Sequence, residues 1–366
     1  MTSAHMSAYL SKISVSLPPF KTEQNQLASF MRNALPVDEE KAHLLEVIYR
    51  ASGIHSRYSV LDDFKKNKSC RFSPNRPFPS VKERMDIYKE HALPLAIQAL
   101  EGVFQITKRE SITHLIVVSC TGMYAPGLDI ELTRECGLSS CIERTAIQYM
   151  GCYAAFNGLK VAKNIVEANA SAQVAMVCVE LCSIHLQQET DEDALLSNAL
   201  FADGAAAALI TGEKVTDTAL SLEEQYNDLY FEGIDEMSWN VGNNGFEMKL
   251  SGKVPEVIRS GISTLTERLL KGMHLTLSEI SYYAIHPGGK KILQVIKEEL
   301  GLKKPDMEPS LHVLKEYGNM SSSTVLFVMD HLWKNLTVSD DGKYLLSFAF
   351  GPGLTMESLL MKVHAH

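Results

Sequence analysis

A strand–turn–helix unit that occurs twice is the feature that most constrains the fold of this 366-residue chain. In the first copy, the apolar run 112–119 predicts a buried strand that ends in a turn of small residues. The chain later reaches Cys152 just before a helix predicted over Ala154–Ala168, and a further strand is predicted over Gln173–Leu181.

The second copy has the same order of elements. A strand predicted over 280–285 ends at His286, Asn319 stands just before a helix predicted over Ser321–Trp333, and a strand over Lys343–Phe350 follows. A chance likeness of short α/β segments is the alternative. Because the two copies agree in order and in chemistry, we interpret them as a duplicated structural unit.

The duplication predicts two fused halves, 1–214 and 215–366, in a chain that is too long for one small core. Leu115–Ser119 and Val174–Val179 are nearly continuous apolar runs, which indicates strands that helices cover on both faces. We therefore predict a layered α/β fold. Ligands bind at the ends of strands in open α/β sheets, and the turns that carry the cysteine, histidine and asparagine fall there.

The composition narrows the functional classes. A net charge of −9, with 45% apolar and 22% charged residues, is typical of a folded protein and argues against nucleic-acid binding as its main task. No run of about 18 apolar residues is present, so no membrane insertion is expected. Met1–Lys12 lacks the long apolar run of a signal peptide, and we expect a cytoplasmic protein.

The seven cysteines do not predict a disulfide framework, because their number is odd and the chain is long. Cys178 and Cys182 have a spacing that some metal ligands share. They flank an apolar strand, however, so we interpret them as buried thiols and predict no metal site.

Local signals predict two helices outside the repeat. The first spans Val37–Ser52, with Asp38 as its N-cap and Gly53 at its end. The second spans Val81–Phe104, with a kink or a break at Pro94.

The three polar residues of the repeat predict an acyl-transfer site. Cys152 follows Gly151 at a sharp bend before a helix, which predicts an exposed sulfur at the positive end of the helix dipole and a favoured thiolate. His286 can stabilise that thiolate as an imidazolium. Asn319 supplies a neutral donor for an oxyanion or enolate. A strand-end histidine and a capping asparagine are the alternatives for the last two.

Five segments of the chain resemble the signature segments of the type III polyketide synthases, the chalcone synthase-like family. They occur in the family's order and spread over nearly the whole chain. The resemblance implies the thiolase fold, with five layers in the order α/β/α/β/α, an internal pseudo-twofold and a homodimer. The segments are Gly151–Tyr153, Ala199–Ala206, Ile285–Gly289, Tyr317–Ser322 and Phe350–Thr355.

The resemblance also implies a role for each site residue. Cys152 takes an acyl starter from coenzyme A (CoA) and holds the growing chain as a thioester. His286 and Asn319 stabilise the enolate that forms when malonyl-CoA loses CO2, and Phe201 lines the channel to the cavity. The product then cyclises by Claisen, aldol or lactone closure. The substrates are acyl-CoA and malonyl-CoA, and no cofactor, metal or carrier protein is implied.

The CoA contacts depart from the family pattern. Plant relatives carry basic residues on the helix that matches Val37–Ser52. Arg50 and Arg57 are the CoA-binding candidates that this chain offers, and a surface arginine is the alternative for Arg57. The positions that are basic in those relatives hold Leu44, Val47 and Ala51.

The side chains at the cavity positions also differ from those of plant relatives. These differences favour a fatty acyl starter that gives alkylpyrone or alkylresorcinol products. A short starter, or malonyl units alone, is the alternative. Cys120, Glu180 and Ser321 match a network implicated in aldol closure, and because a thiol is a weak hydrogen-bonder we predict that this network is weakened and that pyrone or Claisen products compete. The other cavity positions are Ala125, Cys182, His185, Trp239 and Met248, with Gly351, Pro352 and Gly353 forming the loop of the cyclisation pocket.

Three rival interpretations stay open. The ketoacyl synthase III branch of the same fold also uses cysteine, histidine and asparagine, but the setting of Phe201 and the Gly351–Gly353 loop favour the polyketide branch. A Cys-His-Asn hydrolase is disfavoured because such peptidases lack the duplicated α/β organisation. A non-catalytic scaffold is disfavoured because all three polar residues are intact.

Overall fold

The computed structural model describes residues 7–65 and 71–365. Its strands are β1 (Tyr9–Ser16), β2 (Phe20–Glu23), β3 (Ser56–Ser59), β4 (His114–Ser119), β5 (Glu143–Gln148), β6 (Gln173–Leu181), β7 (Asp203–Thr211), β8 (Thr218–Leu229), β9 (Met237–Gly242), β10 (Gly245–Leu250), β11 (Ile280–Ile285), β12 (Tyr344–Gly351) and β13 (Thr355–Ala365). Its α-helices are α1 (Gln24–Ala34), α2 (Glu39–Ala51), α3 (Val81–Phe104), α4 (Leu128–Glu135), α5 (Ala154–Ala168), α6 (Glu192–Leu200), α7 (Val254–Gly272), α8 (Lys290–Glu299), α9 (Lys304–Tyr317) and α10 (Thr324–Trp333).

The strand order confirms the duplication. The main sheet runs β11-β12-β13-β8-β1-β7-β6-β4-β5. In the N-terminal half, β4 pairs parallel to β6, and β6, β7 and β1 then pair antiparallel. In the C-terminal half, β11 pairs parallel to β12, and β12, β13 and β8 then pair antiparallel. The two sets therefore have the same topology, and a short β1–β8 pairing joins them.

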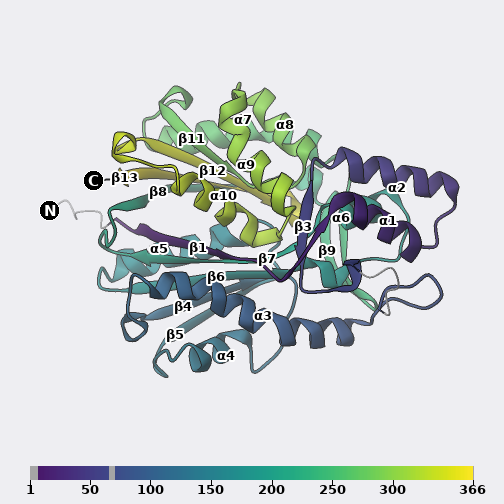
Figure 1. Cartoon of the computed structure of the whole chain (residues 1–366). Helices are drawn as coiled ribbons and strands as arrows, with labels where there is room; N and C mark the ends of the chain where they lie inside the picture. The colour runs from purple at the N-terminus through teal and green to yellow at the C-terminus, as the bar shows by residue number, and fades with distance from the viewer. Residues whose placement is uncertain (1–6, 66–70, 366) are drawn as a thin grey trace.

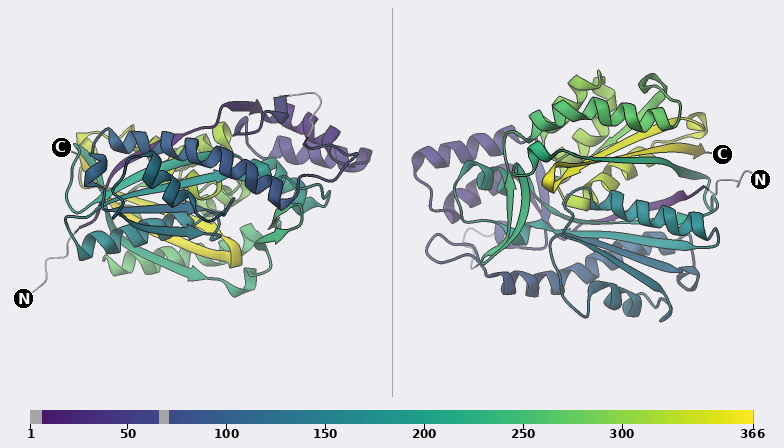
Figure 2. Two further views of the ribbon diagram at one scale, coloured as in Figure 1. Left: turned by 90° about the horizontal axis from the view of Figure 1, so that it is seen from below. Right: turned by 180° about the vertical axis from the view of Figure 1, so that it is seen from behind.

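Three apolar cores separate the layers. The middle core joins α5 and α10 to the inner faces of both halves of the sheet. A second core packs α3 and α4 on the outer face of the N-terminal strands, and a third packs α7 and α8 on the outer face of the C-terminal strands. In Figure 1 the α3–α4 layer lies at the bottom and α7–α8 at the top, and Figure 2 shows the same layers from behind. The predicted α/β/α/β/α order is confirmed.

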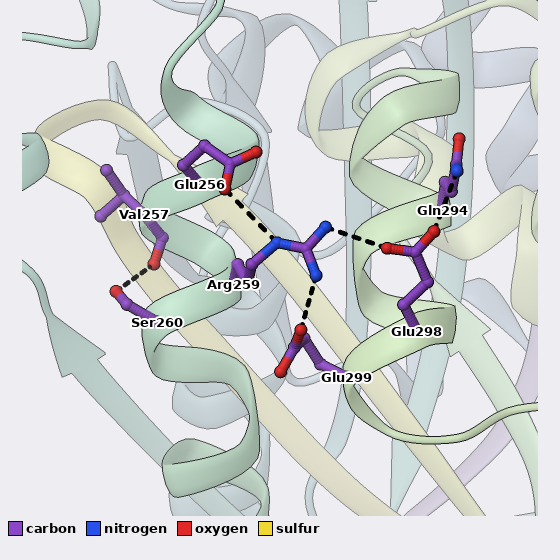
Figure 3. A network of polar contacts seen from close by, with 7 residues as sticks. All are labelled: Glu256, Val257, Arg259, Ser260, Gln294, Glu298 and Glu299. Atoms are coloured by element: carbon purple, nitrogen blue, oxygen red, sulfur yellow. Dashed lines mark hydrogen bonds and ion pairs between the residues drawn. The ribbon is translucent and has the colours of Figure 1, made fainter.

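The outermost C-terminal layer is joined by an ion-pair network. Arg259 of α7 donates to Glu298 at 2.9 Å and to Glu299 at 2.6 Å, both on α8 (Figure 3). Its Nε lies 3.4 Å from Glu256 one turn away. The network links α7, which packs on β8 and β13, to its neighbour α8.

Most of the helix bounds and caps that were predicted from the sequence agree with the structure. α5 has the predicted bounds, and Asp38 caps α2 by accepting from the amide of Lys41. α3 continues through Pro94 as one helix, so the predicted break is wrong. The helix predicted from Ser321 begins as a 3-10 turn, Ser321–Ser323, and becomes α-helical only at Thr324.

A lobe at one end of the sheet contains α1, α2, α6, the β2–β3 pair and the β9–β10 hairpin, on the right in Figure 1. It covers the ends of the strands that carry the predicted site residues. Within residues 7–65 and 71–365, no helix has both the length and the apolar character needed to cross a membrane.

Candidate active site

The turn before α5 can accept only glycine at position 151. Tyr149 and Gly151 both have positive φ, 65° and 86°. A Cβ on Gly151 would stand 2.3 Å from Cδ of Pro352, and one on Gly351 would stand 2.4 Å from the Tyr153 ring. The turn that presents Cys152 is therefore packed directly against the Gly351–Gly353 loop.

The structure brings Cys152, His286 and Asn319 to one small cavity of about 10 Å³. They come from the turn before α5, the end of β11 and the turn before α10. Phe201 lines the same cavity, at the end of α6. Its remaining walls are Met237, Met248, Leu250, Gly288, Ile292 and Phe350. Five of the predicted site residues, Met248 included, thus meet although the sequence separates them widely.

The orientation of Asn319 is fixed by its own backbone and side chain. Its amide donates to the carbonyl of Leu200 at 2.9 Å, and its carbonyl accepts from Ala202 at 2.8 Å, so it pairs with the strand-like segment around Phe201. Its Oδ1 accepts from the amide of Ser321 at 2.9 Å. Its Nδ2 lies 4.0 Å from the sulfur of Cys152. The carboxamide nitrogen therefore donates toward the reactive sulfur across the cavity.

His286 is buried, at 1% exposure, and its amide donates to the carbonyl of Phe348 at 2.8 Å. Neither ring nitrogen has a hydrogen-bond partner among the described residues. Burial lowers the pKa of His286 to about 3, so the ring is neutral. Buried polar atoms in folded proteins are nearly always bonded, and this imidazole is the group at the cavity that most needs a ligand.

Cys152 does not match its predicted environment. The residue is 5% exposed, so the expected exposure of its sulfur is wrong. Burial raises the pKa of the Cys152 thiol to about 12, although hydrogen bonds from Ser321 and Asn319 act to lower it. The bend does present the sulfur before α5, but layers from the other half of the chain cover it. The cysteine and histidine therefore rest as a neutral thiol and a neutral imidazole.

The neutral histidine predicts a pH effect on stability. In the unfolded chain His286 takes up a proton near its ordinary pKa of 6.5, whereas the folded state resists protonation down to about 3. Stability is therefore lost as pH falls below about 6.5, by roughly 2 kcal/mol at pH 5. We expect wild type to lose that amount between pH 8 and pH 5 relative to His286→Gln, measured by urea unfolding. A difference that stays constant with pH would contradict it.

A second cavity, which we call the inner chamber, lies beyond Phe201 and Met248 and has a volume of about 40 Å³. Phe201 and Met248 line both cavities. The predicted cavity residues Cys182, His185 and Trp239 all lie in its wall. Its other walls are Thr22, Leu27, Met31, Tyr49, Arg57, Tyr58, Ser59, Phe64, Ser183, Leu186, Gln187, Ser197 and Asn198.

His185 attaches the β9–β10 hairpin to the body of the protein. Its Nε2 donates to the carbonyl of Thr121 at 2.7 Å, and its Nδ1 accepts from the amide of Phe246 at 3.0 Å, which fixes one neutral tautomer. Its ring stacks on that of Phe246, with centroids 4.3 Å apart. Trp239 on the same hairpin donates to the carbonyl of Cys120 at 2.8 Å. These contacts hold the hairpin that carries Trp239 and Met248.

Replacing His185 with leucine is expected to destabilise the protein by about 2–4 kcal/mol. The change keeps the bulk but leaves the carbonyl of Thr121 and the amide of Phe246 buried without partners, and each such group costs about 1–3 kcal/mol. Denaturant unfolding measures the loss. His43→Ala, at an exposed position of α2, is the control. Equal stability of His185→Leu and wild type would show that the hairpin needs no such anchor.

The hydrogen bonds around Glu180 differ from those of the network predicted for aldol closure. Glu180 accepts from the amide of Cys120 at 3.0 Å and from the hydroxyl of Thr121 at 2.8 Å, and it also accepts from Ser322. The Cys120 sulfur instead accepts from the amide of Gly151 at 3.0 Å. Ser321 is not among the residues that donate to the carboxyl, because a turn at Ser321 with φ of 49° directs Ser322 there, whereas the Cys120 thiol stays close enough to Glu180 to interact with it. Burial raises the pKa of Glu180 to about 7.

Arg57 is not the surface residue that the sequence suggested. It is 7% exposed, and it donates from Nε to Gln24 at 3.0 Å and from Nη1 to the carbonyls of Asn198 at 2.9 Å and Phe201 at 2.5 Å. The β2–β3 pairing turns the side chain inward, so it anchors the segment of Phe201 and is not free for CoA. Arg50 and Ala125 are exposed and line neither cavity.

Sequence reasoning missed most of the inner chamber. Its walls come from α1, α2, β2, β3 and α6, where residues such as Leu27 and Met31 look like ordinary core positions. Cys178 and Cys182 are buried, as predicted. Within the described parts of the chain, no group of three or more histidine, cysteine or acidic side chains could hold a metal ion.

Comparison with known proteins shows to which family this chain belongs. Residues 2–214 match the family model of the N-terminal domain of chalcone and stilbene synthases, and residues 227–364 match that of the C-terminal domain. The chain therefore belongs to the chalcone and stilbene synthase family, and its relatives are type III polyketide synthases.

The relatives span most of the chain. It is 32% identical over 325 residues to an "Alpha-pyrone synthesis polyketide synthase-like Pks18" of Mycobacterium tuberculosis, covering 86% of this chain and 81% of the relative. It is 29% identical to "Type III polyketide synthase A" of Arabidopsis thaliana, covering 93% and 88%. The solved structure of PKS-I from the brown alga Ectocarpus siliculosus superposes with a TM-score of 0.91 at 30% identity, covering 99% and 100%.

The C-terminal type III polyketide synthase domain of Steely1 from Dictyostelium gives the same TM-score of 0.91 at 27% identity, covering 98% of this chain and 100% of that domain. These likenesses extend over both halves of the sheet. They support the thiolase-like architecture that the strand order shows.

Proposed function

We propose that this chain loads an acyl starter from CoA onto Cys152, extends it with malonyl-CoA by decarboxylative condensation, and cyclises the product. One observation carries the proposal. His286 has two ring nitrogens without a partner among the described residues, and it shares its cavity with the sulfur of Cys152 and the amide donor of Asn319, which points at that sulfur. A thiol, a base and a neutral donor around one space are the groups that this chemistry needs.

The loading step begins with the thiol of Cys152 and the imidazole of His286 both neutral. The Cys152 proton moves to His286 as the sulfur attacks the thioester carbonyl carbon. The bond from that carbon to the sulfur of CoA breaks, and the imidazolium returns the proton to the departing CoA. A transient ion pair of this kind avoids holding a thiolate in a buried site, where burial disfavours charge.

In the extension step, His286 and Asn319 act as hydrogen-bond donors. The malonyl carbon–carboxylate bond breaks and CO2 leaves, and its electron pair forms an enolate on the thioester oxygen. The ring N–H of neutral His286 and the Nδ2 of Asn319 donate to that oxygen. The enolate carbon then attacks the acyl group on Cys152 and releases its sulfur. Phe201 gives the cavity an apolar wall that disfavours the malonyl carboxylate and favours neutral CO2.

For the starter, we propose a fatty acyl-CoA. The inner chamber has an apolar side formed by Leu27, Met31 and Phe64, and Cys182 adds a small side chain to its wall. A relative named for α-pyrone synthesis supports a pyrone product. Met248 separates the two cavities, and an unbranched thioether can change rotamer to join them. The second candidate is a short starter, which the small volumes of about 10 and 40 Å³ favour.

For ring closure, we propose a pyrone or Claisen product. Glu180 accepts from Thr121 and Ser322, which are not members of the predicted aldol network, and this competition for its oxygens supports the proposal. A decarboxylated resorcinol as the main product would contradict this proposal.

Incubating the purified protein with malonyl-CoA and a ladder of acyl-CoA starters tests the function. Product masses give the starter, the number of extensions and the closure. A parallel arm with malonyl on a carrier protein tests the ketoacyl synthase III alternative. No product from any CoA starter would overturn the proposal. We also propose a homodimer, which size-exclusion chromatography with light scattering tests.

A further inference from the structure

A closed ring of hydrogen bonds joins the turn before α5 to the turn before α10. The sulfur of Cys120 accepts from the amide of Gly151 at 3.0 Å, one residue before Cys152. The amide of Cys120 donates to Glu180 at 3.0 Å, and the same carboxyl accepts from the hydroxyl of Ser322. The end of β4, the strand β6 and the turn before α10 are therefore held together by one buried side chain.

The ring closes at Asn319. Ser322 belongs to the 3-10 turn Ser321–Ser323, and the first amide of that turn donates to Oδ1 of Asn319 at 2.9 Å. This bond directs the Nδ2 of Asn319 toward the sulfur of Cys152, which lies 4.0 Å away. The turn that orients the carboxamide is thus the turn that Glu180 holds.

Glu180 is the acidic member of the ring and is fully buried, at 0% exposure. Burying a carboxyl costs free energy unless hydrogen bonds compensate, and burial raises the pKa of Glu180 to about 7. Its two oxygens face opposite halves of the chain. Oε2 accepts from Cys120 and Thr121 on the N-terminal half, and Oε1 accepts from Ser322 on the C-terminal half. One carboxyl therefore fixes both halves beside the candidate site.

We propose that Glu180 is a positioning residue for the extension step, and that it acts through Ser322 to place the amide of Asn319 relative to the sulfur of Cys152. The inference rests on the proposed function and names the group that keeps its two reactive turns in register. A catalytic group that is displaced by about 1 Å can lose about 10²-fold in rate. Breaking one bond of the ring should therefore affect the chemistry more than the fold.

Ser322→Ala removes one bond of the ring and tests the proposal through two rates. Mass spectrometry follows the acylation of Cys152 by an acyl-CoA starter and, in a separate reaction, the decarboxylation of malonyl-CoA to acetyl-CoA. We expect decarboxylation to fall by about 10–10²-fold, and acylation to stay within about threefold of wild type because loading does not use the Asn319 donor. Ser322→Cys keeps a weaker donor and should lie between wild type and Ser322→Ala.

Glu180→Gln is the conservative variant of the carboxyl. Its amide oxygen can accept from Cys120, and its NH2 can donate to the hydroxyl of Ser322, so the ring can stay closed. We expect decarboxylation by Glu180→Gln to exceed that of Ser322→Ala. Ser358→Ala is the control, because it removes a buried hydroxyl that bonds the carbonyl of Tyr226 at 2.6 Å, outside the ring. It should keep both rates, whatever stability it loses in urea unfolding.

A double-mutant cycle separates positioning from general support of the fold. If Ser322 acts through Asn319, Ser322→Ala should change decarboxylation by less than about twofold in the Asn319→Ala background, because the group that it places is already absent. A merely structural role would lower the rate by the same factor in both backgrounds.

Three results overturn the inference. They are unchanged decarboxylation in Ser322→Ala, an equal loss of acylation and decarboxylation, and a full further loss in the Asn319→Ala background. Each leaves the proposed function standing, because wild type still acylates Cys152 and decarboxylates malonyl-CoA. If wild type does neither, the proposed function fails and this inference fails with it, and the wild-type assay alone identifies that case.

Discussion

Replacing Cys152 with alanine is expected to abolish chain extension and to leave the fold intact. Cys152 supplies the one thiol that the described residues place at the cavity, beside the imidazole of His286 and the amide of Asn319, so alanine removes the atom that would hold the acyl chain. We expect polyketide formation to fall by at least about 10³-fold. The loss of one buried sulfur should change the free energy of unfolding by only about 1 kcal/mol.

Intact-protein mass spectrometry after incubation with an acyl-CoA starter measures the loading step directly. Wild type should gain one acyl group and Cys152→Ala none. Cys141→Ala is the matched control, because Cys141 is an exposed cysteine outside both cavities. If Cys152→Ala still accumulates polyketide, the starter is loaded on another residue.

Replacing Asn319 with aspartate is expected to slow extension by about 10²–10³-fold and to leave loading in place. Oδ1 of Asn319 is held by the amide of Ser321, so an aspartate would keep that oxygen and replace the NH2 donor that faces the Cys152 sulfur with a second oxygen. An acceptor would then face the enolate oxygen that the donor is proposed to stabilise. Losses of this size follow the removal of one donor from an oxyanion site.

Separate rates for acylation of Cys152 and for product formation test this expectation. Asn335→Asp is the control, since it makes the same change in an exposed side chain that also donates through Nδ2. Equal loss of loading and extension would indicate that Asn319 supports the fold of the site rather than the chemistry. An unchanged extension rate would remove it from the mechanism.

Much of the fold could be predicted because its signals are local. The bounds of α5 and β6 follow from runs of small and apolar residues, and the repeated order of these elements predicted two copies of one topology. The likeness of the two copies also predicted that Cys152, His286 and Asn319 would meet. Duplicated units that pack against each other place equivalent turns at equivalent ends of their strands.

The environment of each side chain could not be predicted in the same way. The turn at Gly151 suggested an exposed sulfur, but Cys152 is buried, with Pro352 packed on Gly151 and with Phe201 and Asn319 lining the same cavity as the sulfur. Arg57 looked like a surface residue until the pairing of β2 with β3 turned it onto the carbonyl of Phe201. Ser322 rather than Ser321 reaches Glu180, because one residue with positive φ shifts the direction of the next.

The sequence by itself determined the family, the layered α/β architecture, the duplication and the three polar residues of the candidate site. Those features depend on spacing, periodicity and glycine-bearing turns, which neighbouring residues set. Only the tertiary structure decided that the thiol and the imidazole are buried and neutral, and that Glu180 joins the end of β4 to the turn that orients Asn319. Burial and hydrogen-bond partners arise between segments far apart in the chain, so no local pattern encodes them.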